Sequence, residues 1–204
     1  DNVGTADTAY RLTNGNYVVV TSSWDNGTSV DAGAVTWGSG ISGISGEVSS
    51  SNSLVGTSAY DLIGYTEYYG PAGLTPLVNG NYVVLSLGWD NGTVVNVGAV
   101  TWGNGMSGTS GEVSGLNSLV GTQAWDRVGN HGVTPLTNGN YVVNTDDWHD
   151  VGAVTWGDGS SGTIGQVSSS NSLVGSYASD YVGYGEVTAL ANGNYVVSSP
   201  SWSN

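Results

Sequence analysis

The feature that most constrains the fold of this chain is a block of sequence that occurs in four copies. The string Asn-Gly-Asn-Tyr-Val-Val stands at 14–19, 79–84, 138–143 and 192–197. In the first three copies, Gly-Ala-Val-Thr-Trp-Gly and then Asn-Ser-Leu-Val-Gly follow it. A repeat of this length predicts one array of similar supersecondary units.

A second motif, Asp-x-Val-Gly or Asp-x-Ile-Gly, marks the start of each unit. Cutting the chain before its Asp gives units 1–60, 61–125 and 126–179 and a partial unit 180–204. The partial unit holds only the first two of the predicted strands. We therefore expect either a longer parent chain or completion of this unit by another chain, to which open strand edges would pair.

Each full unit carries four short runs of β-forming residues. A run ending in Thr-Pro-Leu or a similar triplet is joined to Tyr-Val-Val by Asn-Gly-Asn, and Asn-Gly between apolar runs indicates a hairpin. Ala-Val-Thr-Trp and Ser-Leu-Val-Gly supply the third and fourth runs, and the enrichment in Val, Thr, Tyr and Trp favours strands. Four strands in about 54 to 65 residues are typical of a propeller blade. The prediction is an all-β, β-propeller-like array of four-stranded blades, with a β-solenoid as the alternative.

Charge and composition exclude several classes of partner. The net charge is -14, with Arg11 and Arg127 as the only basic residues apart from two histidines. Such a field repels phosphate backbones and anionic lipid surfaces, so we expect no nucleic acid partner. No apolar run is long enough to span a membrane, and the absence of Cys excludes disulfides and thiolate metal sites. Neutral glycans and divalent cations remain as ligands.

The repeat resembles those of large secreted bacterial haemagglutinin-like or adhesin-like proteins. The resemblance rests on four strings that follow one another in the chain: L-x-N-G-N-Y-V-V-x-S-x-x-W-D-N-G, G-A-V-T-W-G, G-x-x-G-x-V and N-S-L-V-G. These repeats are similar to the FG-GAP, integrin-type propeller blade, and the resemblance covers essentially the whole chain. It implies secretion and display at the cell surface. FG-GAP blades commonly carry a D-x-D-x-D-G calcium loop, which this sequence lacks, because the acidic run at 146–150 and Asp158-Gly159 do not match it. Binding of Ca²⁺ as a cofactor is therefore implied by the resemblance alone.

The copies differ in length at two links. One link leads from the fourth strand of a unit to the first strand of the next, and the other joins the second strand to the third. In a four-stranded blade both links emerge on the same face, so we expect them to share one rim. Variation confined to one face is typical of a binding surface in repeat proteins.

The candidate ligand-binding residues are the aromatic and polar side chains of that rim. They are Trp24, Asp25, Asn26, Tyr65, Tyr68, Tyr69, Trp89, Asp90, Asn91, Trp148, His149 and Asp150. Flat aromatic rings beside carboxylates and amides can stack on a sugar and bond its hydroxyls. The alternative is that the recurring Trp packs between blades and that Asp-Asn-Gly only forms a turn.

No catalytic set is recognisable. His131 and His149 are the only histidines, no G-x-S-x-G string occurs, and the acidic position of Glu47 and Glu112 is Gln166 in the third unit. The sequence therefore predicts a non-enzymatic extracellular binding or adhesion module that recognises a glycan or another surface ligand. The alternative is a structural subunit of an extracellular fibre or sheath.

Overall fold

A computed structural model describes residues 9–66 and 73–203, and they form an all-β array of four-stranded units. The first unit holds β1 (Ala9–Arg11), β2 (Tyr17–Thr21), β3 (Ala34–Gly38) and β4 (Ser53–Val55). The second holds β5 (Leu74–Pro76), β6 (Tyr82–Ser86), β7 (Ala99–Gly103), β8 (Gly111–Glu112) and β9 (Ser118–Val120). The third holds β10 (Val133–Pro135), β11 (Tyr141–Thr145), the 3-10 turn η1 (Trp148–Asp150), β12 (Ala153–Gly157), β13 (Gly165–Gln166) and β14 (Ser172–Val174). The partial unit holds β15 (Val187–Ala189) and β16 (Tyr195–Val197).

Apart from the two-residue strands β8 and β13, the strands of each unit pair in the order in which they occur in the chain. The antiparallel sheets run β1-β2-β3-β4, β5-β6-β7-β9 and β10-β11-β12-β14, while β15 and β16 form a hairpin. The register is the same in every full unit, with Tyr17 opposite Gly38, Tyr82 opposite Gly103 and Tyr141 opposite Gly157. The prediction of an all-β array of four-stranded units is therefore confirmed.

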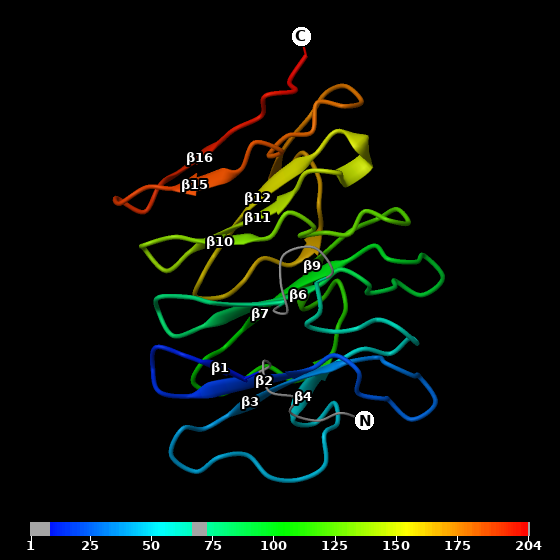
Figure 1. Ribbon diagram of the computed structural model, residues 1–204, viewed down its shortest axis with the longest axis vertical. Coiled ribbons are helices and arrows are strands. Elements are labelled where there is room, and N and C mark those ends of the chain that lie inside the picture. The colour runs from blue at the N-terminus through cyan, green and yellow to red at the C-terminus, as the bar shows by residue number, and fades with distance from the viewer. Residues whose placement is uncertain (1–8, 67–72, 204) are drawn as a thin grey trace.

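The Asn-Gly-Asn string forms the hairpin turn that its sequence predicts. In the first unit, the N–H of Asn16 donates to the side-chain oxygen of Asn14, and the N–H of Leu12 donates to the carbonyl of Asn16. Gly15 has a φ of 91°, a backbone conformation that glycine adopts without steric cost. The turns of successive units lie along one edge of the array (left in Figure 1), opposite the longer links.

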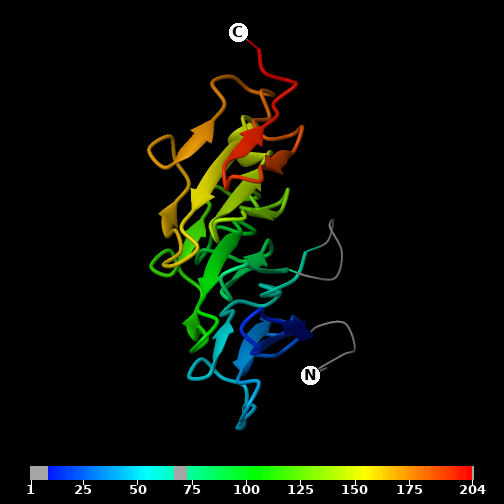
Figure 2. The same cartoon turned by 90° about the vertical axis from the view of Figure 1, so that its left-hand side faces the viewer.

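Successive units stack in a line, with the first unit at one end of the array and the partial unit at the other (Figures 1 and 2). Among the described residues, these ends do not meet to close a ring. The apolar core lies largely between units: one cluster joins the first two units, for example through Val18, Val35 and Val84. A second cluster joins the second and third units. Each unit thus buries its apolar face against its neighbour, as stacked repeats must.

Neighbouring units also share strand pairs. The short strand β8 of the second unit pairs in parallel with β4 of the first, and β13 of the third pairs in parallel with β9 of the second. Parallel pairing between successive repeats also occurs in β-solenoids. The array thus combines the four-stranded units predicted for blades with direct hydrogen bonding from one unit to the next. Among the described residues, no helix is long and apolar enough to cross a membrane.

Two buried tyrosines should make the fold sensitive to alkaline pH. Burial raises the pKa of Tyr82 and of Tyr141 to about 12, and hydrogen bonds with Thr109 and Thr163 offset only part of this rise. Because the unfolded phenols ionise near pH 10, the unfolded chain releases these protons first. The contribution of the two protonated phenols to the free energy of unfolding is therefore complete below about pH 10. It falls as the pH rises towards 12, by up to about 3 kcal/mol for each phenol.

Urea unfolding measured from about pH 8 to about pH 12 tests this expectation. Tyr82→Phe keeps the ring in place and removes the ionisable group, so it should remove about half of the alkaline loss that the two phenols cause together. An unfolding free energy that stays level through this range in the unmodified chain would contradict the expectation.

Candidate functional site

The two links that vary in length lie against each other in every unit. In the first unit, the N–H of Tyr60 donates to the carbonyl of Val30 at 2.9 Å, and the N–H of Leu62 donates to the carbonyl of Asp31 at 3.1 Å. The second unit repeats these bonds between Trp125 and Val95 and between Arg127 and Asn96, and the third between Ser179 and Asp150. We call the surface formed by the paired links the rim; it lies along the right-hand side of Figure 1.

The rim holds bulky residues in a left-handed backbone conformation. The φ angles are 67° at Tyr60, 71° at Trp125 and 44° at Arg127. Such angles cost about 1 to 3 kcal/mol for each residue other than glycine and persist only where the surroundings fix them. Here the second link holds them, since their N–H groups donate to the carbonyls of Val30, Val95 and Asn96, respectively. Strain of this kind is concentrated at functional sites.

A pocket of about 250 Å³ opens on the rim between the first two such links. We call it the rim pocket; it is lined by Tyr60, Leu62, Tyr65, Leu87, Gly88, Asn96, Trp125 and Arg127. The side chains of Tyr60 and Trp125 are 63% and 57% exposed. The guanidinium carbon of Arg127 lies 5.1 Å from the centre of the Trp125 ring, a cation-π arrangement. The rim pocket thus offers aromatic faces, a cation and an amide.

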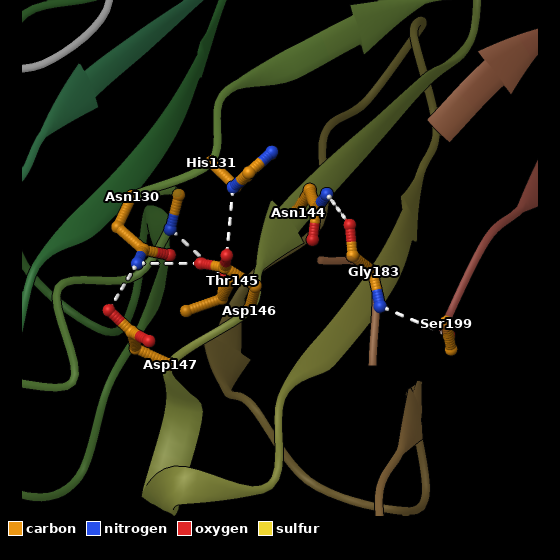
Figure 3. Close-up of polar contacts among 9 residues, drawn as sticks. Asn130, His131, Asn144, Thr145, Asp146, Asp147, Gly183 and Ser199 are labelled. Atoms are coloured by element: carbon orange, nitrogen blue, oxygen red, sulfur yellow. Dashed lines mark hydrogen bonds and ion pairs between the residues drawn. The ribbon is translucent and has the colours of Figure 1, made fainter. Parts of the chain in front are cut away.

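The equivalent surface one unit further on is acidic and polar (Figure 3). Asn130 Nδ2 donates to Asp146 Oδ1 at 2.8 Å and to Asp147 Oδ2 at 3.1 Å, and His131 Nδ1 lies 2.8 Å from Asp146 Oδ2. Burial, followed by the charges of Asp146 and Asp150, raises the pKa of Asp147. These side chains largely bond one another. Within residues 9–66 and 73–203, no group of three or more His, Cys, Asp or Glu residues is arranged to hold a metal ion.

Several of the candidate residues serve the fold rather than face solvent. Trp89 and Trp148 are buried in the core clusters, and Trp24 is half-buried. The burial of Trp89 and Trp148 favours the packing alternative for these two indoles.

The acidic and amide residues beside these tryptophans bond within their own loops. Asp25 Oδ1 accepts the N–H of Asp31 at 2.8 Å, and Asp90 Oδ1 accepts the N–H of Asn96 at 2.7 Å. Asn26 Nδ2 donates to the carbonyl of Gly56 at 2.8 Å. Asn91 is exposed and pairs through its backbone with Val94. These contacts favour the turn alternative for Asp-Asn-Gly.

The remaining candidates fall in three different settings. The His149 ring stacks on Trp148 with 3.9 Å between ring centres, and the neighbouring Asp150 is exposed. Tyr65 lines the rim pocket, while Tyr68 and Tyr69 lie outside the described residues.

Of the residues that line the rim pocket, the sequence analysis predicted only Tyr65. It missed the side chains that supply the pocket's other aromatic, amide and cationic groups: Tyr60, Asn96, Trp125 and Arg127. A signal for them was present. The position of Tyr60 in the first unit is occupied by Trp125 in the second and by Ser179 in the third. The position of Leu62 is likewise occupied by Arg127 and then by Tyr181. These side chains change from unit to unit inside a link of constant backbone geometry, as expected where a surface is adapted to a ligand.

Comparison with known proteins places the whole array in one sequence family. A family model described as a repeat of unknown function (DUF5650) matches residues 11–65, 76–130, 135–184 and 189–204. Each of the first three matches falls mainly within one unit of the array and reaches into the link that follows it, and the fourth falls within the partial unit. A search of curated proteins finds no significant match.

Proposed function

The chain belongs to the DUF5650 repeat family, and from that premise we propose that it is a non-enzymatic binding module that recognises a glycan through the rim pocket. The observation that carries this proposal is the pair of exposed aromatic rings, Tyr60 and Trp125, held on left-handed backbone around one pocket. Aromatic rings of this kind stack on the apolar face of a sugar, while a few placed polar groups bond its hydroxyls.

Charge supports the choice of ligand. Sixteen acidic residues against two arginines disfavour a polyanionic partner, whereas a neutral or weakly acidic sugar is not repelled. Arg127 is one of those two arginines, and its planar guanidinium can bond adjacent hydroxyls or a carboxylate in a bidentate manner. Asn96 adds an amide on the opposite link. The pocket is large enough for about one sugar ring, so the affinity for a single site would be low.

A catalytic role is not part of this proposal. The arrangement closest to a nucleophile-His-acid set is Thr122, His149 and Asp126, in which His149 Nε2 lies 3.0 Å from Thr122 Oγ1 and 3.5 Å from Asp126 Oδ2. A catalytic triad needs the acid on the other ring nitrogen, where it orients the His. Asp126 Oδ2 also accepts the N–H groups of Thr122 and Gln123. This cluster therefore holds the link together.

Glycan-array binding by the purified chain tests the proposal. We expect Trp125→Ala and Tyr60→Ala each to weaken binding about tenfold, near the lower end of the about 1 to 3 kcal/mol that a nucleobase gains by stacking on one aromatic side chain. Both side chains are largely exposed, so the fold should persist, which thermal melting checks.

Tyr177→Ala is the matched control. Tyr177 is 62% exposed in the corresponding link of the third unit but lies outside the rim pocket, so its removal should leave binding unchanged. A silent array, or an equal loss in the Tyr177→Ala variant, would contradict the proposal.

In the cell, we propose that the module is secreted and displayed at a bacterial surface as part of an adhesin-like protein, as the resemblance of its repeats implies. A structural role in a fibre or sheath is the second candidate. It is favoured by the direct strand pairing between successive units, β8 with β4 and β13 with β9, which suits an array of such units extended in a line. Electron microscopy of the purified chain distinguishes the two, because only the structural role requires filaments.

A further inference from the structure

The rim pocket is lined by no acidic side chain, although the chain carries sixteen acidic residues. The charged group of its lining is the guanidinium of Arg127, and Arg127 is one of only two arginines in the sequence. The chain as a whole has a net charge of -14. The residues that line this pocket therefore carry a charge of the opposite sign to that of the whole molecule.

The same positions one unit further on are acidic. Three lining residues of the rim pocket are replaced by aspartates in the third unit: Leu87 by Asp146, Gly88 by Asp147 and Asn96 by Asp150. The carboxylates of Asp146 and Asp147 lie beside Asn130 on that surface (Figure 3). An anion would be repelled there. Of these two surfaces, only the rim pocket can accept an anion.

Asn96 is the replacement that isolates charge from shape. The corresponding residue is Asp31 in the first unit and Asp150 in the third, and the φ angles are 51° at Asp31, 51° at Asn96 and 60° at Asp150. Asn and Asp both tolerate this left-handed conformation. The backbone N–H of Asn96 donates to Asp90 Oδ1 just as that of Asp31 donates to Asp25 Oδ1. The second unit thus keeps the turn and removes the carboxylate that would share the pocket with Arg127.

The guanidinium of Arg127 is held in place without a carboxylate partner. Its central carbon lies 5.1 Å from the centre of the Trp125 ring, and the backbone N–H of Arg127 donates to the carbonyl of Asn96 at 3.2 Å. Within residues 9–66 and 73–203, the guanidinium donates no hydrogen bond, and the ion pairs found there are those of His131 and His149. The N–H groups of Arg127 are therefore open to a ligand.

The acidic surface nearby does not neutralise this cation. Burial raises the pKa of Asp147, and the charge of Arg127 offsets that rise only in part. Asp147 Oδ2 accepts the hydrogen bond of Asn130 Nδ2 at 3.1 Å instead. At an ionic strength of about 0.15 M, exposed charges more than about 8 Å apart are largely screened from each other. The distant acidic residues of the chain therefore oppose the binding of an anion in the pocket only weakly.

We propose that the sugar bound in the rim pocket is a uronic acid whose carboxylate pairs with Arg127, an inference that rests on the glycan recognition proposed above. The planar fork of a guanidinium matches a carboxylate through two parallel hydrogen bonds. The ring of the same sugar has an apolar face for Tyr60 or Trp125 and hydroxyls for the Asn96 amide.

The overall charge of the chain narrows this ligand class further. One carboxylate on one ring meets the local cation, whereas a heavily sulfated polymer would meet the repulsion of the whole molecule. The ligand is thus a uronic acid that lies at the end of a glycan or between neutral sugars.

Chemical-shift titrations of the isotope-labelled chain with two matched pairs of ligands test the proposal. Methyl glucuronoside and methyl glucoside differ only in a carboxylate in place of a hydroxymethyl group, and methyl galacturonoside and methyl galactoside differ in the same way. We expect the uronoside of at least one pair to bind about tenfold more tightly than its neutral partner. Equal or tighter binding of a sulfate ester of the neutral glycoside would overturn the assignment of a carboxylate.

Two variants should remove this preference by different routes. Arg127→Gln keeps a hydrogen-bond donor and removes the charge, while Asn96→Asp places in the pocket the acid that stands at the same position in Asp31 and Asp150. Each should reduce the preference for the uronoside from about tenfold to less than about twofold and leave binding of the neutral glycoside within about twofold. Because Asp31 adopts the same φ in the same turn, Asn96→Asp should fold, which thermal melting checks.

Arg11→Gln is the matched control. Arg11 is exposed in β1, lies outside the rim pocket and, when replaced, changes the net charge by the same single unit as Arg127→Gln. This variant should keep the full preference. A preference that is absent in the unmodified chain, survives Arg127→Gln or is lost equally in Arg11→Gln would overturn the inference. If neutral glycosides bind without that preference, glycan recognition stands and only the uronic acid fails. If no glycoside and no glycan of the array binds, both proposals fail.

Discussion

Gly105→Ala is expected to lower the free energy of unfolding by about 4 kcal/mol, although it adds a single methyl group. The new Cβ would lie 1.7 Å from Gly80 O, so the loop must move by more than 1 Å to relieve the clash. Forcing extra atoms into packed structure costs about 1 to 3 kcal/mol. The movement also separates Gly105 O from the three groups of the first unit that donate to it, Asn14 Nδ2, Asn16 Nδ2 and Trp37 Nε1. Each lost hydrogen bond adds about 0.5 to 1.5 kcal/mol to the loss of stability. Urea unfolding followed by Trp fluorescence measures the change.

Gly115→Ala in the same unit controls for the general effect of replacing a glycine. The nearest atom to its new Cβ would be a Val120 methyl carbon at 3.5 Å, an ordinary contact, so its stability should stay within about 0.5 kcal/mol of the unmodified chain. If the two variants unfold at the same urea concentration, the hydrogen bonds that Gly105 O accepts from the first unit are not a main source of cohesion between the units.

The strands and hairpins were predictable because their signals are local. Asn-Gly-Asn specifies a turn, and the Val-rich runs that flank it have a composition that suits strands. The identical registers of the three full sheets follow from the identical strings, as Tyr17 and Tyr82 show by facing equivalent glycines. The topology of a four-stranded unit also predicted that the two variable links share one rim, because both links emerge on the same face of such a unit.

The pairing between units was not predictable in the same way. The strands β8 and β13 are only two residues long and consist of Gly-Glu and Gly-Gln, which show neither alternation nor strand-forming residues. They are extended only because the neighbouring β4 and β9 present an edge to them. A contact of this kind depends on the distance between units, which no local pattern encodes.

The predicted candidate residues and the lining of the rim pocket share the rim but overlap only at Tyr65. The Trp that recurs in every unit was a predicted ligand-binding residue, but packing also produces recurrence at a fixed position, and Trp89 and Trp148 are buried. The exposed rings of Tyr60 and Trp125 occupy a position whose residue changes between units. Their exposure depends on a left-handed backbone, which nothing in a Tyr or Trp residue indicates.

Asp61→Ala should be the second strongly destabilising change, at about 3 kcal/mol. Asp61 is fully buried; its Oδ2 accepts the N–H groups of Thr57 and Ser58 at 2.8 Å, and its Oδ1 accepts the N–H of Asp90 at 2.9 Å. The first two bonds close the link at the end of the first unit, and the third ties this link to the second unit. Removing the carboxylate leaves three N–H groups without an acceptor, at about 1 kcal/mol or more for each that stays buried.

Asp61→Asn and Glu47→Ala separate the contribution of these bonds from that of charge. Burial raises the pKa of Asp61 while the three N–H groups oppose that rise, so the carboxylate is kept in an unfavourable environment by the bonds that it accepts. Because Asn keeps one acceptor oxygen, Asp61→Asn should lower the free energy of unfolding by less than Asp61→Ala does. Glu47→Ala removes an exposed carboxylate and should change the free energy of unfolding by less than about 0.5 kcal/mol. If all three variants unfold alike, the Asp-x-Ile-Gly motif marks the start of a unit without joining it to its neighbour. If only the Asp61 variants lose stability, the residue that divides the sequence into units is also one that holds them together.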